Sequence, residues 1–345
     1  MTAHRAFGLL AVCVMLSSVL GLTACGGSGG TYGSGGGSAS GSAAAPSKLF
    51  GADSTDRVIG SLANPNPAAG PLTVDRVIGP TSPYFFNYAG FSTNIRSLAL
   101  DTTRDYLYVG NGTLVLVFHG ASMANGDLFA DAKFGPIGNT GSMFLDAAND
   151  RLYVGDDVND VKVFSGASTA SGTPTPRHIT GMTTPIHGVA VDTTTKNILY
   201  VSNDNSSTHQ ISVFDNADTV TIAAPNRTII PTVSAVNQPV GGISLDATHD
   251  VLYVAPGVTG NGIMVFSTAS TANGPIAPAK TLAIPSAPGI LSVLVDSSND
   301  RLYAVGSNGH IYLIEAVSTL SSGTATAKDA SLSNGGMLTA VAVSP

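Results

Sequence analysis

The chain repeats one pattern of apolar and polar positions along most of its length. A short apolar segment ends in Asp, a polar turn follows, a second apolar segment reads Leu-Tyr-Val or similar, and a third ends in Val-Phe or an equivalent. A regular period of this kind indicates a protein built from stacked structural repeats. The Asp recurs at spacings of 45, 46, 54 and 50 residues, at Asp101, Asp146, Asp192, Asp246 and Asp296.

Each repeat is expected to contain four short strands. Its apolar runs are rich in Val, Ile, Tyr and Phe and are separated by Gly, Asn, Asp and Pro, which is typical of strands joined by turns. The fourth strand carries one basic residue, which we expect at a solvated outer edge. Four strands per repeat predict an all-β protein, a β-propeller of four-stranded blades. The tyrosines of the second strands, expected in the core, are Tyr108, Tyr153, Tyr200, Tyr253 and Tyr303.

The two ends of the repeating region predict a closed ring of six blades. The last residues, Leu338–Pro345, match a first strand, whereas Lys48–Phe50 matches a second strand. The segments Asp56–Gly60 and Val74–Gly79 then supply a third and a fourth strand. We therefore expect the N-terminal strands to pair with the C-terminal strand, which completes one blade and removes an exposed sheet edge.

The N-terminal residues are typical of a bacterial export signal. Arg5 precedes an apolar stretch, Ala6–Leu20, that is too short to span a bilayer comfortably. The next residues, Leu22–Cys25, resemble the lipobox of bacterial lipoproteins, whose Cys becomes lipidated. We therefore predict a signal peptide over residues 1–24 and lipidation at Cys25.

Residues 25–47 are expected to tether the lipid anchor to the propeller of residues 48–345. The segment is almost entirely Gly, Ser and Ala, so it behaves as a flexible linker that spans about 25–28 Å. The residue after the lipidated Cys is Gly26 and not Asp, which by the same resemblance favours the outer membrane. We expect a lipid-anchored protein there, facing the periplasm or the cell surface.

Composition narrows the classes of partner. Without Arg5 of the signal peptide, 14 basic residues stand against 22 acidic ones, a net charge of −8. An acidic domain is a poor ligand for nucleic acid and for anionic lipid, so we expect membrane contact through the anchor alone. All but one of the acidic residues are Asp, which favours turns over helices. Both Cys lie at or before residue 25, so the propeller has no thiol chemistry.

The repeat resembles the NHL and lactonase-like group of bacterial propellers. Thr184–Asp192, TPIHGVAVD, is the copy that follows that group's pattern most closely, and the resemblance covers residues 48–345. The group includes enzymes, binders and scaffolds, so the resemblance implies the fold and not an activity. Its gluconolactonase-like members hold a divalent metal with Glu, Asn and Asp side chains at the channel. The only Glu here, Glu315, is expected on the far side of its blade from that mouth.

The repeated Asp residues suggest a ring of carboxylates, but turn chemistry is the better interpretation. Each precedes a tight turn in which its side chain can accept hydrogen bonds from the amides ahead of it. Better binding candidates are Arg96 and His187, which stand five residues before the repeated Asp, at the start of an inner strand near the channel. The other copies carry small or apolar residues or Thr at this position, namely Gly141, Gly241, Leu291 and Thr339.

Two further segments are candidates for binding. Asp156, Asp157 and Asp160 lie in one loop and could hold Ca²⁺ through their carboxylates, or form a solvated acidic rim. The segment from Gly79 to Asn94 gathers aromatic side chains that either plug the channel and pack on a blade or bind a sugar or protein. These aromatic residues are Tyr84, Phe85, Phe86, Tyr88 and Phe91.

The motifs of common nucleophilic and metal-dependent enzymes are missing from the chain. The hypothesis that fits best is therefore a lipid-anchored binding or scaffold module for an envelope protein or glycan, without a cofactor and without catalytic residues. The alternative is a metal-assisted lactonase or related hydrolase with its site at the channel mouth and Ca²⁺ as cofactor. A purely structural surface protein without a pocket is a third possibility.

Overall fold

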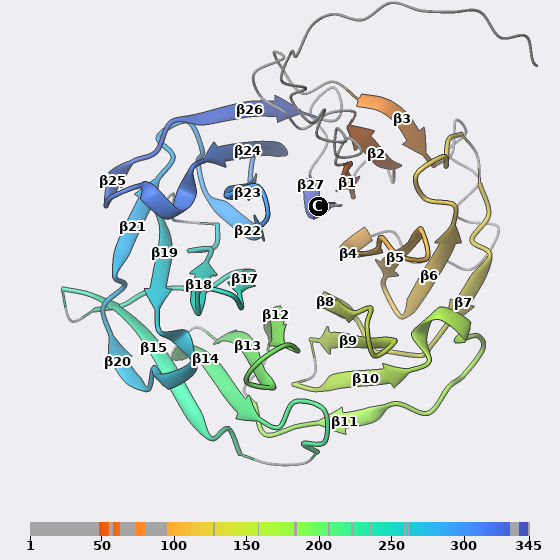
Figure 1. Cartoon of the computed structure of the whole chain (residues 1–345), viewed down its shortest axis with the longest axis horizontal. Coiled ribbons are helices and arrows are strands. Elements are labelled where there is room, and N and C mark those ends of the chain that lie inside the picture. The colour runs from red at the N-terminus through yellow and green to blue at the C-terminus, as the bar shows by residue number, and fades with distance from the viewer. Residues whose placement is uncertain are drawn as a thin grey trace, which may run out of the picture. The chain divides into compact units, whose positions relative to one another are not determined.

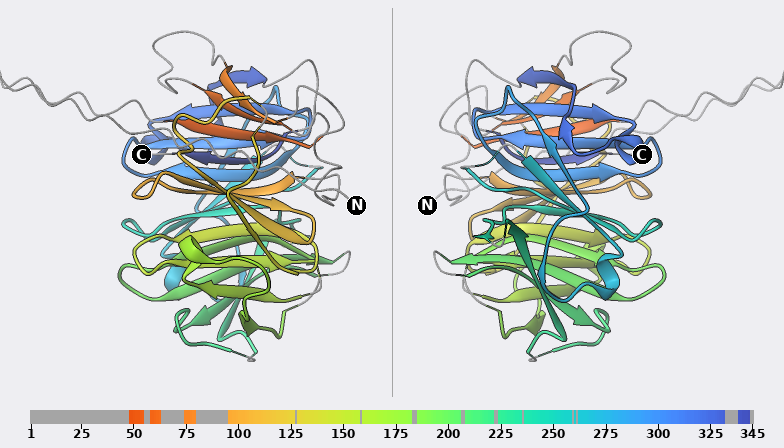
Figure 2. Two further views of the ribbon diagram at one scale, coloured as in Figure 1. Left: turned by 90° about the vertical axis from the view of Figure 1, so that its right-hand side faces the viewer. Right: turned by 90° about the vertical axis from the view of Figure 1, so that its left-hand side faces the viewer.

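Six antiparallel sheets, each built on four strands, lie around a central axis in the computed structural model of the chain (Figure 1). This arrangement confirms the predicted six-bladed β-propeller. The side views show the strands running along the axis, so the loops gather on two faces (Figure 2). The structure describes residues 48–54, 58–62, 74–79, 95–126, 128–157, 159–182, 185–205, 208–221, 224–234, 236–258, 260, 262–331 and 338–343.

In each blade the first strand is innermost and the fourth is outermost. The inner strands, from blade 1 to blade 6, are β27 (Leu338–Val343), β4 (Ile95–Asp101), β8 (Thr140–Asp146), β12 (Ile186–Asp192), β17 (Ile243–Asp246) and β22 (Ile290–Asp296). The second strands are β1 (Leu49–Asp53), β5 (Tyr106–Asn111), β9 (Arg151–Asp156), β13 (Ile198–Asn205), β18 (Val251–Val254) and β23 (Arg301–Gly306).

The outer half of each blade is built in the same way. The third strands are β2 (Val58–Leu62), β6 (Leu114–His119), β10 (Val161–Ser165), β14 (Thr208–Asp215), β19 (Gly262–Ser267) and β24 (His310–Glu315). The fourth strands are β3 (Val74–Ile78), β7 (Ala132–Phe134), β11 (Arg177–Ile179), β15 (Arg227–Val233), β21 (Lys280–Ala283) and β26 (Ala327–Ser331). A short strand, β16 (Val236–Asn237), forms a hairpin with β15.

The ring closes as predicted, with the C-terminal strand inside blade 1. Strand β27 pairs antiparallel with β1, so that Leu49 faces Val343 and Gly51 faces Val341. The same strand β1 pairs with β2 on its other side. Closure thus joins residues from the two ends of the chain and pairs β1 on both of its edges.

The core lies between neighbouring blades. Apolar side chains from one sheet pack against those of the next and form six buried clusters, one for each blade junction. The tyrosines of the second strands lie in these clusters, as predicted, and Tyr108 and Tyr303 are fully buried. Desolvation raises the pKa of Tyr303 to about 12, because an ionised phenol is costly in an apolar layer.

The outer edges are covered by chain from the next blade. Strand β20 (Gly274–Ile276) pairs in parallel with β15, and β25 (Gly323–Thr324) pairs in parallel with β21. Two single bridges, Ile78 with Gly126 and Phe134 with Gly172, repeat this contact in blades 1 and 2. Covered outer strands are protected against pairing with other molecules.

The basic residues of the fourth strands are exposed at Lys133 and Lys328, as expected, but the expectation was wrong for Arg177 and Lys280. Arg177 donates to the carbonyls of Val220 and, at 2.8 Å, of Ala217 in the next blade. Lys280 donates likewise to Val317 at 2.8 Å and to Leu320 at 2.9 Å. Desolvation lowers the pKa of Arg177 and of Lys280, as burial of a cation requires. These side chains therefore connect one blade to the next.

The predicted signal peptide, Cys25 and the tether lie outside the described residues. In the part of the chain that the structure describes, no helix is long and apolar enough to cross a membrane. The described residues belong to a compact unit that spans Ala44–Pro345. The lipid anchor and the outer-membrane location therefore remain predictions.

Candidate binding site at the channel mouth

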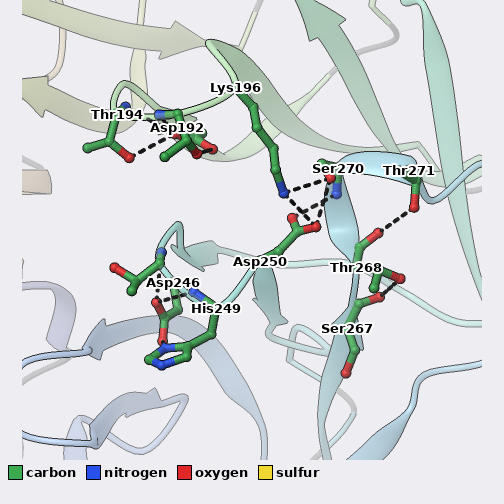
Figure 3. Close-up of polar contacts among 12 residues, drawn as sticks. Asp192, Thr194, Lys196, Asp246, His249, Asp250, Ser267, Thr268, Ser270 and Thr271 are labelled. Atoms are coloured by element: carbon green, nitrogen blue, oxygen red, sulfur yellow. Dashed lines mark hydrogen bonds and ion pairs between the residues drawn. The ribbon is translucent and has the colours of Figure 1, made fainter.

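The repeated Asp side chains hold tight turns, as predicted. Asp192 accepts from the amides of Thr194 and Thr195, each at 3.0 Å, and from both of their hydroxyls. These bonds lower the pKa of Asp192 because they stabilise the carboxylate. Asp246 likewise accepts from the backbone amides of Thr248 and His249, at 3.1 and 3.2 Å (Figure 3). The repeated carboxylates are therefore occupied within the turns between first and second strands.

The second acid of each turn caps a short turn after the third strand. Asp250, whose φ is +57°, accepts from the amide and the hydroxyl of Ser270 at 3.0 and 2.7 Å. Lys196 of the preceding blade reaches the same carboxylate at 2.7 Å and the Ser270 hydroxyl at 2.9 Å (Figure 3). This network fixes the face opposite the channel mouth and joins blades 4 and 5.

A β-bulge at the start of the inner strands directs side chains into the channel. In β4 the register shifts between Ile95 and Ser97, so that Arg96 is the extra residue. The same shift occurs in β8, β12, β22 and β27. In blade 5 Ala255 bonds to both Gly241 and Gly242, which is the same two-against-one arrangement. Bulges re-aim side chains in this way beside functional sites, and the repeated sequence pattern had not revealed them.

The bulged residues lie in the wall of a central cavity of about 260 Å³. Its lining includes Arg96, Gly141, His187, Leu291 and Thr339, which are the second residues of five inner strands. The structure thus brings Arg96 and His187 to one level of one channel, with only Gly141 in the blade between them. We call this level, on the face that carries the loops between second and third strands, the channel mouth.

The charges in this cavity are of one sign. Arg96 and His187 are the ionisable side chains in its wall, and no Asp or Glu lines it. Neither side chain makes a hydrogen bond or ion pair with any residue that the structure describes. Desolvation lowers the pKa of His187, and the more distant Asp204 only partly opposes this effect, so the imidazole is neutral at neutral pH. Among the described residues, the mouth therefore presents one positive charge without a counter-ion.

Apolar side chains from several blades also line the cavity. Leu291 and Val293 of blade 6 and Val341 of blade 1 line it, together with Met143 of blade 3. Gly141 cannot be replaced without disturbance, because a Cβ there would lie 2.6 Å from the carbonyl oxygen of Ile186. The missing side chain keeps the space between Arg96 and His187 open.

The three predicted metal ligands are bonded to other side chains in the structure. The ammonium of Lys162 contacts Asp156 and lies 3.1 Å from the Oδ2 atom of Asp160. Asp157 is directed elsewhere and accepts from the amide of Asn139 at 2.6 Å. Among the described residues, no group of three His, Cys, Asp or Glu side chains is placed to hold a metal ion. The Ca²⁺ site stays a prediction, and Lys162 at the start of β10 is a cation beside this loop that the sequence pattern had not indicated.

The predicted aromatic segment cannot be placed. Tyr84, Phe85, Phe86 and Tyr88 lie outside the described residues. Their role as a binding surface therefore stays a prediction.

Comparison with known proteins supports the fold and leaves the family open. No family model matches the chain, and no curated protein matches it. In contrast, 1355 chains of solved structures match, so the fold is too widespread to define an activity. One is a crystal structure of a nidogen/laminin complex, with a TM-score of 0.58 and 13% sequence identity over 87% of this chain and 98% of that chain. The protein is thus a β-propeller, while its place among NHL-type propellers rests on the sequence resemblance alone.

Proposed function

We propose that this protein is a binding or scaffold module that engages a protein partner, or a glycan, through the face of the ring that carries the channel mouth. The observation that carries the proposal is the cavity wall, where bulges direct Arg96 and His187 into the channel and no described residue pairs with them. Because chain from the next blade covers the outer strands, we expect recognition on the face with the channel mouth and not at the outer edges. The similar propeller comes from a complex between nidogen and laminin, which supports a protein partner.

The same proposal places the module in the bacterial envelope. The lipobox at Leu22–Cys25 and the Gly/Ser-rich tether support a lipid anchor at the outer membrane. Cys25→Ser should move the protein from the membrane fraction to the soluble fraction and abolish its labelling by a radioactive fatty acid. A Cys13→Ser variant is the matched control, because Cys13 lies inside the predicted signal peptide. Unchanged fractionation of Cys25→Ser would remove the anchor from the proposal.

Partner binding is tested by co-purification from envelope extracts. The reversed charge of Arg96→Glu should abolish recovery of the specific partner, because the cation of the described channel wall is replaced by an anion. Lys328→Glu, on the exposed edge of blade 6, makes the same change in net charge away from the channel and should leave recovery unchanged. If both variants recover the partner equally, the channel mouth is not the binding site. Phe85→Ser with Phe86→Ser tests the aromatic segment in the same assay.

A further inference from the structure

The channel mouth is complementary to one negative charge. The guanidinium of Arg96 lies in a concave wall and has no carboxylate within the lining to neutralise it. An unpaired charge in a partly desolvated cavity is unfavourable, so such a site gains free energy from a bound anion. The planar fork of Arg matches the two oxygens of a carboxylate, which gives the interaction direction as well as charge.

The charge count favours a monoanion over a dianion. His187 stands at the same level as Arg96, but its lowered pKa keeps the ring neutral at neutral pH, so it contributes hydrogen bonding and not a second charge. Lys162 of β10, behind the mouth, adds no free positive charge, because Asp156 and Asp160 already hold its ammonium. Phosphate, which needs more than one positive charge, therefore fits this site less well than a carboxylate.

The rest of the wall indicates what the carboxylate is attached to. Leu291, Val293 and Val341 line the cavity and offer apolar contact, while Ser292 and Thr339 add hydroxyl groups. The volume of about 260 Å³ corresponds to roughly nine water molecules at ~30 Å³ each, which is enough for a short acid and too little for a large cofactor. A ligand with a carboxylate at one end and a short apolar body would pair with Arg96 and contact the apolar side chains of the wall.

We infer that the channel mouth binds the carboxylate of a short monocarboxylic acid, with Arg96 pairing with the carboxylate and Leu291 contacting the apolar body. The same chemistry could be supplied by a free acid or by an acidic side chain of the bound partner. The inference rests on the proposed function only in using the same mouth, and it is tested without the partner.

Isothermal titration calorimetry of the purified full chain with butyrate, succinate and inorganic phosphate tests the inference. Butyrate should bind saturably and more tightly than the other two probes. Arg96→Gln should weaken butyrate binding at least about tenfold, because a charge-assisted bidentate pair is lost. The affinity of Arg96→Lys for butyrate should lie between those of the unmodified chain and of Arg96→Gln, since Lys keeps the charge but not the planar fork of donors. Lys328→Gln, which removes one exposed positive charge far from the channel, should bind as the unmodified chain does.

The contact of Leu291 with the apolar body of the ligand is tested with a second variant. Leu291→Ser should reduce the preference for butyrate over acetate and leave acetate affinity unchanged. The inference is overturned if butyrate gives no saturable heat, if Arg96→Gln binds it as well as the unmodified chain, or if phosphate is preferred.

The partner assay distinguishes the two sources of the carboxylate and the two proposals. If butyrate binds and also displaces the co-purified partner, the partner supplies the carboxylate to the same mouth. If butyrate binds and the partner stays, the natural ligand is a free acid. Loss of partner binding in Arg96→Glu without any butyrate binding would uphold the proposed function and refute the carboxylate inference.

Discussion

Blades 3 and 5 share one fold but differ in polarity just behind the channel mouth. In blade 3 the end of the second strand carries Asp156, and its diagonal neighbour on the third strand is Lys162. In blade 5 the matching positions are Pro256 and Met264, and Met264 is only 2% exposed. The backbone register of a blade therefore does not dictate the chemistry at these two positions.

The other blades support this comparison. Blade 4 pairs the buried Asn203 with Ser212 at 3.0 Å, whereas blade 6 places Gly306 against the ring of Tyr312. Blade 2 is mixed: Asn111 is 2% exposed, but no described residue forms a hydrogen bond with its side-chain amide, and Leu116 occupies the third-strand position. Blades 3 and 4 therefore hold complete polar pairs, and blades 5 and 6 hold apolar ones.

The largest effect is expected when the polar residue of blade 3 is copied into blade 5. Met264→Lys would bury an ammonium in a cluster whose described members are all apolar. We expect a loss of about 3–5 kcal/mol in the free energy of unfolding, because an unpaired buried charge is strongly destabilising. Urea denaturation measures it. Met264→Leu, which keeps the apolar volume, is the control and should cost less than about 1.5 kcal/mol. A stable Met264→Lys variant would show that the two blades do not differ in the way described.

The reverse exchange, Lys162→Met, should cost about 2–4 kcal/mol because it leaves Asp156 buried without its cation. Adding Asp156→Ala should recover most of this loss, since removing both charges avoids the desolvation cost. The exposed pair between Lys328 and Glu315 is the control, and Lys328→Met should change stability by less than about 1 kcal/mol.

The pair in blade 3 also gives a pH dependence with a defined sign. Burial alone would lower the pKa of Lys162, but hydrogen bonds to Asp156 and Asp160 outweigh it and raise the pKa above its usual value. A raised pKa in the folded state means that the stabilisation is present below the unfolded pKa of 10.5 and is lost as the pH rises through the folded value. The melting temperature should fall between pH 9 and pH 12, and this fall should be smaller in Lys162→Met than in the unmodified chain.

A smaller effect of opposite sign is expected in blade 2. Asn111→Leu removes an amide that is buried without a hydrogen-bond partner, so we expect stability to rise by about 1 kcal/mol. Asn203→Leu in blade 4 is the matched change and should destabilise, because Ser212 would lose its acceptor. Equal effects of the two variants on the midpoint of unfolding would contradict the distinction between a complete and an incomplete polar pair.

The smallest effect is expected from Ca²⁺. Lys162 already neutralises Asp156 and Asp160, and Asp157 is bonded to Asn139, so millimolar Ca²⁺ should not shift the melting temperature. Metal analysis of the purified chain should find less than about a tenth of an equivalent of divalent metal per chain. A bound cofactor would stand well above this level, and a trace contaminant below it. A clear upward shift would instead favour the metal-assisted hydrolase as the function.

The sequence by itself determined the features that depend on residues close together in the chain. The spacing of Asp101, Asp146 and their counterparts predicted the repeat, because Asp in a tight turn bonds to amides two and three residues ahead. The unequal phase of the two ends, with Lys48–Phe50 matching a second strand and Leu338–Pro345 a first, predicted the closure through β1 and β27. Turn chemistry between neighbouring residues and the regular repeat length were sufficient to predict the six-bladed propeller.

Tertiary structure alone decided what surrounds the channel and what joins the blades. The bulges at Arg96 and His187 arise from the register between two strands, which no spacing in one strand reveals. The partners of Lys162 and Arg177 depend on loops and blades that the one-dimensional pattern does not place in contact. These contacts join segments that are distant in the sequence and meet only in the folded chain. The sequence therefore predicted candidate site residues, but only the fold showed which of them line one cavity.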